Sequence, residues 1–446
     1  MFARDILHEL EHWRHFSRRK PLLLRGARQV GKTTVVSEFG RGFDNYLYFN
    51  LERKSDRALF ERSVSMSVLV DQLFLYHHLQ RKPGETLVFI DEIQNSPMAI
   101  SLLRYFYEEH PELHVIAAGS LLENVVDVGC SFPVGRVQYL PVRPCSFREF
   151  AAAVGKDHLL TMATEESMAP VVHDELMMFF NRYLLVGGMP AAVAAYAESH
   201  DALAIDDIFE TLLLAYRDDT EKYVRTGKIS EVVRFILQHG WQAAGETVTL
   251  GGFAGSAYRS REVGEAFRLL EKAMLLELVY PATSAELPAI PELKRQPKLI
   301  WLDTGLVNYA AGIRNDIIGA SDILDVWKGR IAEHVVAQEL LTLNHKISQQ
   351  RQFWVKGKSS ESAEVDFTWT VDSRLIPIEV KAGHNSHLRS LHSFIDAGPT
   401  EVAVRVWSGP LSIDTLCTTI GRKPFKLINL PFYLVGSMEA IIRKNG

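Results

Sequence analysis

A glycine-rich segment near the start of the sequence carries residues whose types and spacing suit the binding of phosphate groups. Residues 26–33 read GARQVGKT, which matches the pattern GxxxxGK followed by Ser or Thr. Glycines let backbone N–H groups turn toward phosphate oxygens, the lysine ammonium neutralises the β- and γ-phosphates, and the threonine hydroxyl is a ligand for Mg²⁺. We therefore expect ATP and Mg²⁺ to be bound by Gly26, Gln29, Gly31, Lys32, Thr33 and Thr34.

Two adjacent acids follow an apolar run further along the chain. Residues 87–90 are LVFI, and Asp91 and Glu92 come directly after them, at the C-terminal end of a predicted strand. We expect Asp91 to hold Mg²⁺ through its water shell, Glu92 to polarise the water that attacks the γ-phosphate, and Ser120 to contact that water or the γ-phosphate. Metal placement together with a general base favours hydrolysis. The alternatives are a site that binds nucleotide without hydrolysing it, and a chance glycine turn beside an acidic strand end.

A second group of acids, with a lysine, lies toward the C-terminus. Asp366 lies in EVDF and Glu379 and Lys381 lie in EVK, and both segments alternate polar with apolar residues, as half-buried strands do. A turn at residues 371–374 would pair these strands and bring Asp366 near Glu379, with Glu379 and Lys381 on one face. Glu333 lies upstream in a predicted helix. The alternative is an ordinary strand with a surface ion pair.

The order of these residues resembles the PD-(D/E)xK nuclease superfamily. The resemblance implies that Glu333, Asp366 and Glu379 are metal ligands that hold Mg²⁺ against a scissile phosphate, and that Lys381 is catalytic. No proline precedes Asp366, which departs from the pattern. Trp354, Lys356 and Lys358 are then candidates for contact with a sugar-phosphate backbone. Such folds are also reused for binding without cleavage.

The elements that must position the first site form an α/β pattern. Short apolar runs alternate with amphipathic stretches, which predicts a parallel sheet covered by helices on both faces. The predicted strands are residues 22–24, 46–51, 86–90 and 114–118, and the predicted helices are residues 32–39, 68–80 and 99–110.

The middle of the chain is predicted to be helical, with helices at 174–186, 201–216 and 230–238. Residues 249–281 then read as a small-residue turn, a long amphipathic helix and a short strand, which fits a winged helix-turn-helix. Arg259, Arg261 and Arg268 lie at or near its recognition helix, but glutamates are interleaved with them. A winged helix used as a lid or a protein contact is therefore the alternative to one that binds DNA.

A loop rich in Pro, Ala and Glu at 283–297 marks a boundary. A third, α/β region follows it, with predicted strands at 298–302, 352–355, 364–371 and 375–381 and a helix at 329–343. We place the domains at 1–160 (P-loop ATPase), 161–285 (helical lid and winged helix) and 286–446 (nuclease-like).

Length and composition set the outer limits. The chain has 446 residues, 47% of them hydrophobic, and a formal net charge of −5, which excludes a basic field over the whole molecule. Its three cysteines are too far apart for a disulfide framework or a zinc site. The N-terminus is too charged for a signal peptide, and no apolar run approaches the roughly 18 residues of a membrane span. We expect a cytoplasmic protein without a membrane partner.

Several motifs together resemble one family. RGARQVGKTT and FIDEIQ, with SFREF, YLLVGGMP, WLDTGLVNYAAG and the C-terminal EVDF and IEVKAG, are similar to the bacterial and archaeal AAA-type ATPases that carry a C-terminal domain of unknown function. The pieces span nearly the whole chain. The resemblance implies an ATPase core of the ASCE class, a winged-helix segment and a C-terminal fold like that of restriction endonucleases.

The resemblance also implies two further site residues. Gly188 and Pro190 lie where related ATPases carry a GxP motif that packs against the base of the nucleotide, and Arg136 lies where they often carry an arginine aimed at a neighbouring subunit's γ-phosphate. An ordinary turn and a surface arginine are the alternatives. An arginine of this kind would imply a homo-oligomer, with a hexamer as one form.

The leading hypothesis is an ATP-hydrolysing motor or switch that acts on DNA, branched or single-stranded, and binds or cuts it through the C-terminal domain with Mg²⁺. The competing hypothesis is a signalling switch whose C-terminal domain is not catalytic and binds a protein partner. A metabolic kinase is a third class. The adjacent Asp91 and Glu92 argue against it, because this pair suits water as the phosphoryl acceptor better than a small substrate.

Overall fold

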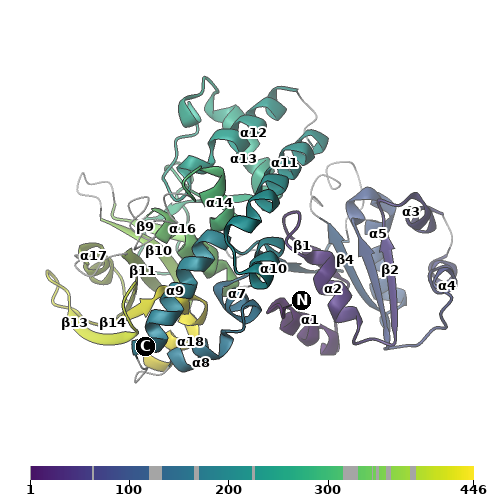
Figure 1. The fold of residues 1–446 in the computed structure, drawn as a ribbon, viewed down its shortest axis with the longest axis horizontal. Coiled ribbons are helices and arrows are strands. Elements are labelled where there is room, and N and C mark those ends of the chain that lie inside the picture. The colour runs from purple at the N-terminus through teal and green to yellow at the C-terminus, as the bar shows by residue number, and fades with distance from the viewer. Residues whose placement is uncertain are drawn as a thin grey trace.

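Three regions follow one another along the chain in a computed structural model (Figure 1). A parallel sheet with its helices lies at one end, a mixed sheet at the other, and a group of helices between them. The structure describes residues 2–62, 65–119, 133–164, 170–223, 227–314, 330–343, 345–347, 351–357, 363–381 and 388–446.

Five described strands form the N-terminal sheet, in the order β2-β3-β4-β1-β5, and all neighbours are parallel. The four predicted strands are confirmed to within one residue at each end. The fifth was not predicted, because it is an edge strand whose first two residues, Gln138 and Tyr139, are exposed. The strands are β1 (Leu22–Arg25), β2 (Asn45–Asn50), β3 (Thr86–Asp91), β4 (His114–Gly119) and β5 (Gln138–Pro141).

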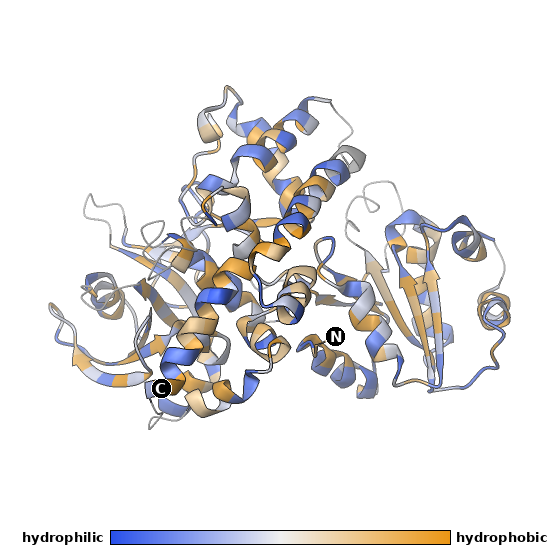
Figure 2. Cartoon of the chain, viewed as in Figure 1, coloured by the Kyte–Doolittle hydropathy of each residue, from blue (hydrophilic) through white to orange (hydrophobic). Residues whose placement is uncertain are grey.

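Every residue of β3 and β4 is buried, because helices cover both faces of this sheet (Figure 2). This confirms the predicted parallel sheet between two helical layers. Since all five strands run in one direction, the segment after β1 and the acids that end β3 lie at the same edge. The helices are α1 (Ile6–His15), α2 (Lys32–Gly40), α3 (Lys54–Glu61), α4 (Met66–Tyr76) and α5 (Pro97–Glu109).

The middle region is helical, as predicted. Its helices are α7 (Phe147–Ala153), α8 (Asp157–Ala163), α9 (Pro170–Val186), α10 (Pro190–Ser199), α11 (Asp206–Tyr223), α12 (Gly227–His239) and α13 (Ser260–Lys272). Helix α13 is amphipathic and buries Val263, Ala266, Phe267 and Leu270, a spacing of three or four residues. An antiparallel pair, β6 (Leu276–Val279) and β8 (Lys298–Trp301), follows it.

The C-terminal sheet has seven described strands in the order β13-β14-β12-β11-β10-β9-β7. They are β7 (Pro281–Ala282), β9 (Gln352–Val355), β10 (Glu364–Val371), β11 (Arg374–Lys381), β12 (Val402–Trp407), β13 (Ser412–Cys417) and β14 (Pro424–Pro431). Helices α16 (Arg330–Leu340), α17 (Arg389–Ala397) and α18 (Met438–Asn445) pack against it, and α14 (Thr304–Ala310) packs against α9, α11 and α16. Among the predicted elements, β9, β10 and β11 are confirmed, and the expected turn pairs Val371 with Arg374.

The strands on either side of the 283–297 loop each pair with the region on the other side of it. The predicted strand at 298–302 forms as β8, but it pairs with β6 of the middle region, whereas β7, which precedes the loop, joins the C-terminal sheet beside β9. The loop therefore connects two interlocked regions. Short 3₁₀ helices complete the fold: η1 (Ile93–Asn95), η2 (Leu203–Ile205), η3 (Trp241–Ala243), η4 (Phe253–Gly255), η6 (Leu341–Leu343) and η7 (Phe432–Ser437).

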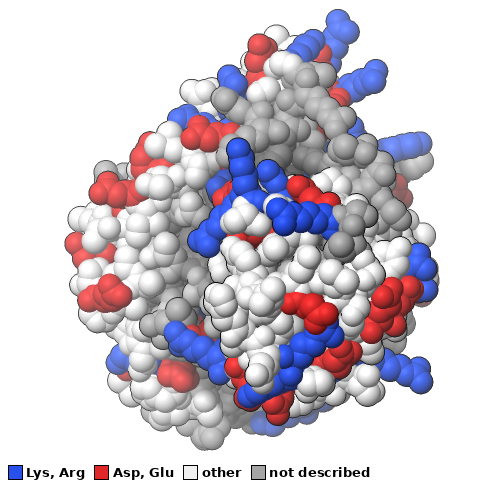
Figure 3. Space-filling view, turned by 90° about the vertical axis from the view of Figure 1, so that its right-hand side faces the viewer, with Lys and Arg blue, Asp and Glu red and all other residues white. Residues whose placement is uncertain are grey.

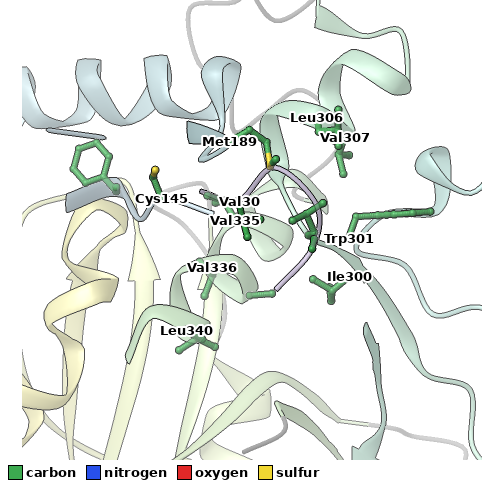
Figure 4. Packing of buried hydrophobic residues seen from close by; sticks show 14 of the residues in the cluster. Val30, Cys145, Met189, Ile300, Trp301, Leu306, Val307, Val335, Val336 and Leu340 are labelled. Carbon is green, nitrogen blue, oxygen red and sulfur yellow. The ribbon is translucent and has the colours of Figure 1, made fainter. Parts of the chain in front are cut away.

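The largest buried apolar cluster runs through all three regions, from Ile6 to Ile442. Figure 4 shows it where the regions meet, with Val30 and Cys145 of the N-terminal region beside Met189 and Val335. None of the described helices is both long enough and apolar enough to cross a lipid bilayer.

Candidate active site

The phosphate-binding loop lies between β1 and the start of α2. Gln29 has φ 65° and Gly31 has φ 90°, so the backbone takes the left-handed conformation at both positions. A Cβ atom on Gly26 would lie 2.3 Å from the Val142 carbonyl oxygen, so only glycine fits there. Helix α2 begins at Lys32, which leaves its first N–H groups free to point toward an anion.

Lys32 lies across this loop. Its ammonium donates hydrogen bonds to the carbonyl oxygens of Gly26 and Ala27, at 2.9 and 2.8 Å. Burial lowers its pKa to about 8, although Glu92 and Asp91 attract the charge. Among the described residues, no carboxylate accepts a hydrogen bond from this lysine, and its charge is available to a phosphate group.

The two acids meet the loop as predicted. The Thr33 hydroxyl donates to Asp91 Oδ2 at 2.7 Å, so both expected Mg²⁺ ligands lie side by side. Glu92 has φ 51°, a left-handed conformation that turns the chain sharply at the end of β3. Burial raises the pKa of both carboxyls.

Two neighbours of the acids were not predicted from the sequence. The Tyr48 hydroxyl donates to Asp91 Oδ2 at 3.3 Å, and the Gln94 amide donates to Glu92 Oε2 at 2.5 Å. Tyr48 comes from β2, the neighbour of β3, where strand alternation gives no sign of a polar role. Gln94 belongs to the FIDEIQ motif quoted above, so its place two residues after Glu92 could have identified it as a partner of that acid.

A cavity of about 570 Å³ opens over the loop, within the size range of ligand pockets. Its lining combines polar residues of the loop with apolar residues. Pro190 is the first residue of α10. Its Cγ would lie 3.5 Å from a Cβ atom built on Gly31, so the proline packs directly over the phosphate loop. The predicted residues that line the cavity are Gln29, Gly31, Lys32, Thr33, Thr34, Glu92 and Pro190, joined by Phe2, Leu7, Ala191 and Ala194.

The N-terminal segment contributes a wall that sequence reasoning missed. Arg4 lines the cavity, donates to the Val30 carbonyl oxygen at 3.3 Å, and forms an ion pair with Glu149 at 2.9 Å. Glu149 also forms a capping box with Ser146 at the start of α7. The Ser-x-x-Glu spacing within SFREF was the available signal for the helix start.

One predicted residue, Arg136, lies elsewhere. Arg136 precedes β5, at the amino edge of the sheet, and the nucleotide cavity is at the carboxyl edge. Its guanidinium pairs with Glu108 at 2.8 Å and cannot reach a nucleotide bound to its own chain. Ser120 lies outside the described residues, directly after β4.

The residues present fit ATP with Mg²⁺. A buried lysine without a carboxylate acceptor, free helix N–H groups and a left-handed glycine suit the phosphates, and Thr33 and Asp91 offer oxygen ligands to Mg²⁺. The apolar wall formed by Phe2, Leu7 and Pro190 suits a base.

The second predicted cluster also assembles, around a lysine that was not predicted. Lys298 of β8 is 3% exposed, and its ammonium lies 2.9 Å from Glu333, 2.8 Å from Glu364 and 3.7 Å from Asp366. The aromatic ring of Phe353, 5.0 Å away, adds a cation–π contact. These carboxylates raise the Lys298 pKa above its ordinary value.

The predicted hairpin brings Asp366 and Glu379 together. Asp366 Oδ2 accepts a hydrogen bond from the Val380 N–H at 2.7 Å, and Lys381 lies 2.8 Å from Glu379, on the same face. Burial raises the pKa of Glu379 to about 8 and that of Glu333 to about 7. Within the described residues, Glu379 Oε2 is buried without a hydrogen-bond partner.

The donor set does not fit the Mg²⁺ ion expected at this second cluster. The Lys298 ammonium occupies the point at which Glu333, Glu364 and Asp366 converge. No group of three or more His, Cys, Asp or Glu in the described ranges is arranged to hold a metal ion. Trp354 was expected at a sugar-phosphate backbone, which is wrong: it is 1% exposed and its indole N–H bonds to the Thr283 carbonyl oxygen. Lys356 is exposed, and Lys358 lies outside the described residues.

A buried polar network joins the two sites. Gly188 lies two residues before Pro190, and its N–H donates to Asp303 Oδ2 at 2.5 Å. A Cβ on Gly188 would lie 2.1 Å from the Cys145 carbonyl oxygen, so this position is tightly packed. Asp303 follows β8, which carries Lys298. Burial raises the Asp303 pKa to about 6.

Helix α16 makes the second connection. Glu333 near its start faces Lys298, and Glu339 near its end accepts hydrogen bonds from the Phe147 N–H, at 3.0 Å, and from the Tyr183 hydroxyl, at 2.8 Å. Burial raises the Glu339 pKa to about 7. One helix thus contacts both the C-terminal cluster and the region that covers the nucleotide cavity.

Comparison with known proteins agrees with the N-terminal geometry. Residues 18–151 match the family model of an AAA domain. Residues 177–317 and 328–409 match two models described as domains of unknown function, DUF8612 and DUF4143. No curated protein matches the chain by sequence.

Solved structures resemble the chain only distantly. The Walker-type ATPase PABY2304 of Pyrococcus abyssi has 16% identity over 70% of this chain and 96% of its own, with a TM-score of 0.41. The Aeropyrum pernix ORC1 protein in complex with DNA has 11% identity over 70% and 92%, with a TM-score of 0.26. The STAND protein PH0952 from Pyrococcus horikoshii, which has a tetratricopeptide repeat sensor, has 12% identity over 77% and 45%, with a TM-score of 0.29. Because these scores are low, the assignment rests on the family match and the site: the N-terminal region is an AAA-type ATPase domain.

Proposed function

We propose that the chain is a Mg²⁺-dependent, ATP-hydrolysing switch that passes the nucleotide state of its N-terminal domain to its C-terminal domain. The observation that carries the proposal is the convergence of Lys32, Thr33, Glu92 and Pro190 on one cavity, with Asp91 bonded to Thr33. Loop, acids and covering proline come from three distant parts of the sequence.

Each residue has a defined task in this proposal. Lys32 exchanges its two carbonyl acceptors for β- and γ-phosphate oxygens, and Thr33 and Asp91 hold Mg²⁺, whose charge offsets that of the phosphates. Glu92 takes the proton from the attacking water. Its raised pKa makes it a better base than an exposed glutamate, and Gln94 holds its carboxylate in place. Arg136 is assigned to a neighbouring copy's nucleotide in a homo-oligomer.

The connection to the C-terminal domain supports a switch. A nucleotide that moves Pro190 also moves Gly188, which is bonded to Asp303, five residues from Lys298. Because this network is buried, a displacement at one end is transmitted as a rearrangement of packed groups. The Lys298-centred cluster favours an output domain that is not catalytic, in line with the protein-binding hypothesis.

Action on DNA is the second candidate function. The convergence of Asp366, Glu379 and Lys381 on two paired strands favours it. The overall charge does not, because a formal net charge of −5 gives no basic field over the whole molecule. Figure 3 shows the opposite end of the molecule, the N-terminal domain, where acidic and basic side chains are interspersed. A nick in DNA that requires Mg²⁺, is lost in Asp366→Ala and persists in Lys32→Ala would establish this candidate instead.

The test of the proposed switch combines turnover with hydrogen exchange. We expect ATP hydrolysis by the full chain, and slower exchange of the α16 amides when the non-hydrolysable analogue AMP-PNP replaces ADP. Asp303→Asn should keep hydrolysis but lose the exchange difference. An absence of ATP turnover with Mg²⁺ overturns the ATPase assignment, and identical α16 exchange in both nucleotides overturns the switch.

A further inference from the structure

A second cavity lies behind the phosphate-binding loop. It has a volume of about 310 Å³ and lies where the N-terminal sheet, the β6–β8 pair and the segment after α16 meet. Val30 of the loop lines it, whereas the adjacent Gln29 and Gly31 line the nucleotide cavity. Figure 4 shows Val30, Ile300 and Trp301, which form part of its wall. The loop therefore separates two cavities.

Basic side chains outnumber acidic ones around this second cavity. Glu277 is shared, because it lies 2.6 Å from Arg351 and also attracts Arg143. Glu271 accepts a hydrogen bond from the Leu278 N–H at 2.9 Å. The cationic lining residues are Arg25, Arg143, Lys272 and Arg351, and the acidic ones are Glu271 and Glu277. Arg25 and Lys272 also have interactions of their own, so the case for an anion rests on Arg143.

Arg143 is the least compensated of these cations. No described residue accepts a hydrogen bond from its guanidinium, and its Nε is enclosed, as is Nε of Arg351. Burial and the nearby Arg351 lower the Arg143 pKa to about 10. The Arg351 side chain is 2% exposed, and its guanidinium already donates to the Ala337 carbonyl oxygen and to Glu277. The Arg143 side chain is partly exposed, but its enclosed Nε has no acceptor. An enclosed donor without an acceptor costs free energy, and a bound anion would supply the acceptor.

The Arg143 guanidinium and the apolar part of the wall restrict the chemical class of the ligand. A guanidinium presents a planar fork of donors that matches a phosphate or a carboxylate. The lining also has apolar residues, among them Val30, Leu276 and Ile300. We propose that this cavity binds a small organic anion, which presents a phosphate or carboxylate to Arg143 and packs an apolar part against these residues.

The position of this anion site gives it a consequence for ATP. Because the phosphate-binding loop forms a wall of both cavities, the anion and the nucleotide contact opposite sides of the same backbone. Each ligand then changes the affinity for the other by the same factor.

The test must keep the anion out of the ATP site. We therefore saturate the full chain with Mg²⁺ and AMP-PNP and titrate phenyl phosphate, following tryptophan fluorescence and the unfolding temperature. Both signals should change and saturate. Arg143→Met should weaken binding about tenfold to a hundredfold, the loss expected for charge-assisted hydrogen bonds. Benzoate, inorganic phosphate and phenol in parallel distinguish a carboxylate, a bare phosphate and an uncharged ring.

Two further variants make the result decisive. Arg261→Met removes an exposed arginine of α13 and should bind as the parent does. Arg143→Lys keeps the charge without the fork, and it should weaken binding even if Arg143→Met does not fold. The proposal is overturned if the parent chain does not respond at about 10 mM phenyl phosphate, a concentration that detects even weak binding. It is also overturned if both Arg143 variants bind as tightly as the parent. ATP turnover measured alongside tests the proposed function separately.

Discussion

The molecule places buried lysines among carboxylates twice, and the two clusters differ in what holds the lysine. Lys32 donates to two backbone carbonyls and faces a cavity of about 570 Å³, with Asp91 and Glu92 nearby. Lys298 lies directly against carboxylates of α16 and β10. The first charge is available to a ligand, and the second is already neutralised. Similar residue types therefore give a reactive site in one place and a structural ion cluster in the other.

ATP turnover should show the largest difference between the Lys32 cluster and the Lys298 cluster. Lys32→Ala and Glu92→Gln should each lower ATP turnover by roughly 10²- to 10⁴-fold, because they remove phosphate neutralisation or the general base. Asp366→Asn should change turnover less than about twofold, a size typical of a group outside the reacting site. Steady-state phosphate release measures all three. A loss in Asp366→Asn as large as that in Glu92→Gln would break the comparison.

Stability should respond in the opposite order. Lys298→Met leaves Glu333, Glu364 and Asp366 without their shared cation, and we expect the free energy of unfolding to fall by about 3–5 kcal/mol. Lys32→Met removes a lysine bonded only to carbonyls and is the matched control, with a change of less than about 1 kcal/mol. Urea unfolding measures both, and equal losses would contradict the distinction.

The network between the clusters should make stability depend on pH. The folded-state pKa of Glu339 is about 7, above the ordinary value of 4.5, because the carboxyl is fully buried. The folded state thus binds more protons than the unfolded state across this range, and Glu339 alone should lower the free energy of unfolding by about 3 kcal/mol as pH rises from about 4.5 to 7. The other buried acids act in the same direction, so Glu339→Gln should make this slope smaller in urea unfolding at pH 5 and 8. A profile that rises with pH would refute the assignment.

Nucleotide affinity should show the smallest effect. The Lys32 pKa is about 8 in the free protein, and a bound phosphate raises it, so affinity is full below pH 8 and falls above it. We expect the dissociation constant for ADP to rise up to about tenfold per pH unit, measured by calorimetry at pH 7, 8 and 9. Lys32→Arg keeps its charge throughout and should give a flat profile. A flat profile in the parent chain would mean that burial does not shift this lysine.

Local motifs made the first cluster readable from the sequence. The phosphate loop and the Asp91-Glu92 pair follow strands whose apolar runs are unambiguous, and their meeting follows from the parallel sheet. Phe2 and Arg4 were missed because nothing local links them to a loop more than twenty residues away. The same holds for Tyr48, whose role depends on a neighbouring strand.

The second cluster was only partly predictable. The turn at 371–374 and strand alternation gave the β10–β11 hairpin. Lys298 was missed because its partners lie 35 and more residues further along, and because β8 pairs with the middle region. Its position turned an expected metal site into a set of ion pairs. Trp354 was wrongly expected to contact a ligand, because its place next to lysines in the sequence does not show that its own side chain is buried.

The exchange of strands across residues 283–297 matters to anyone who wishes to express the last region alone. A polypeptide starting at residue 286 would lack β7, so β9 would become a bare sheet edge, and it would carry β8 without its partner β6. Unpaired edges recruit other chains, and such a fragment should aggregate. One that starts ahead of α12, near residue 227, would retain both pairings and remain a candidate for independent folding.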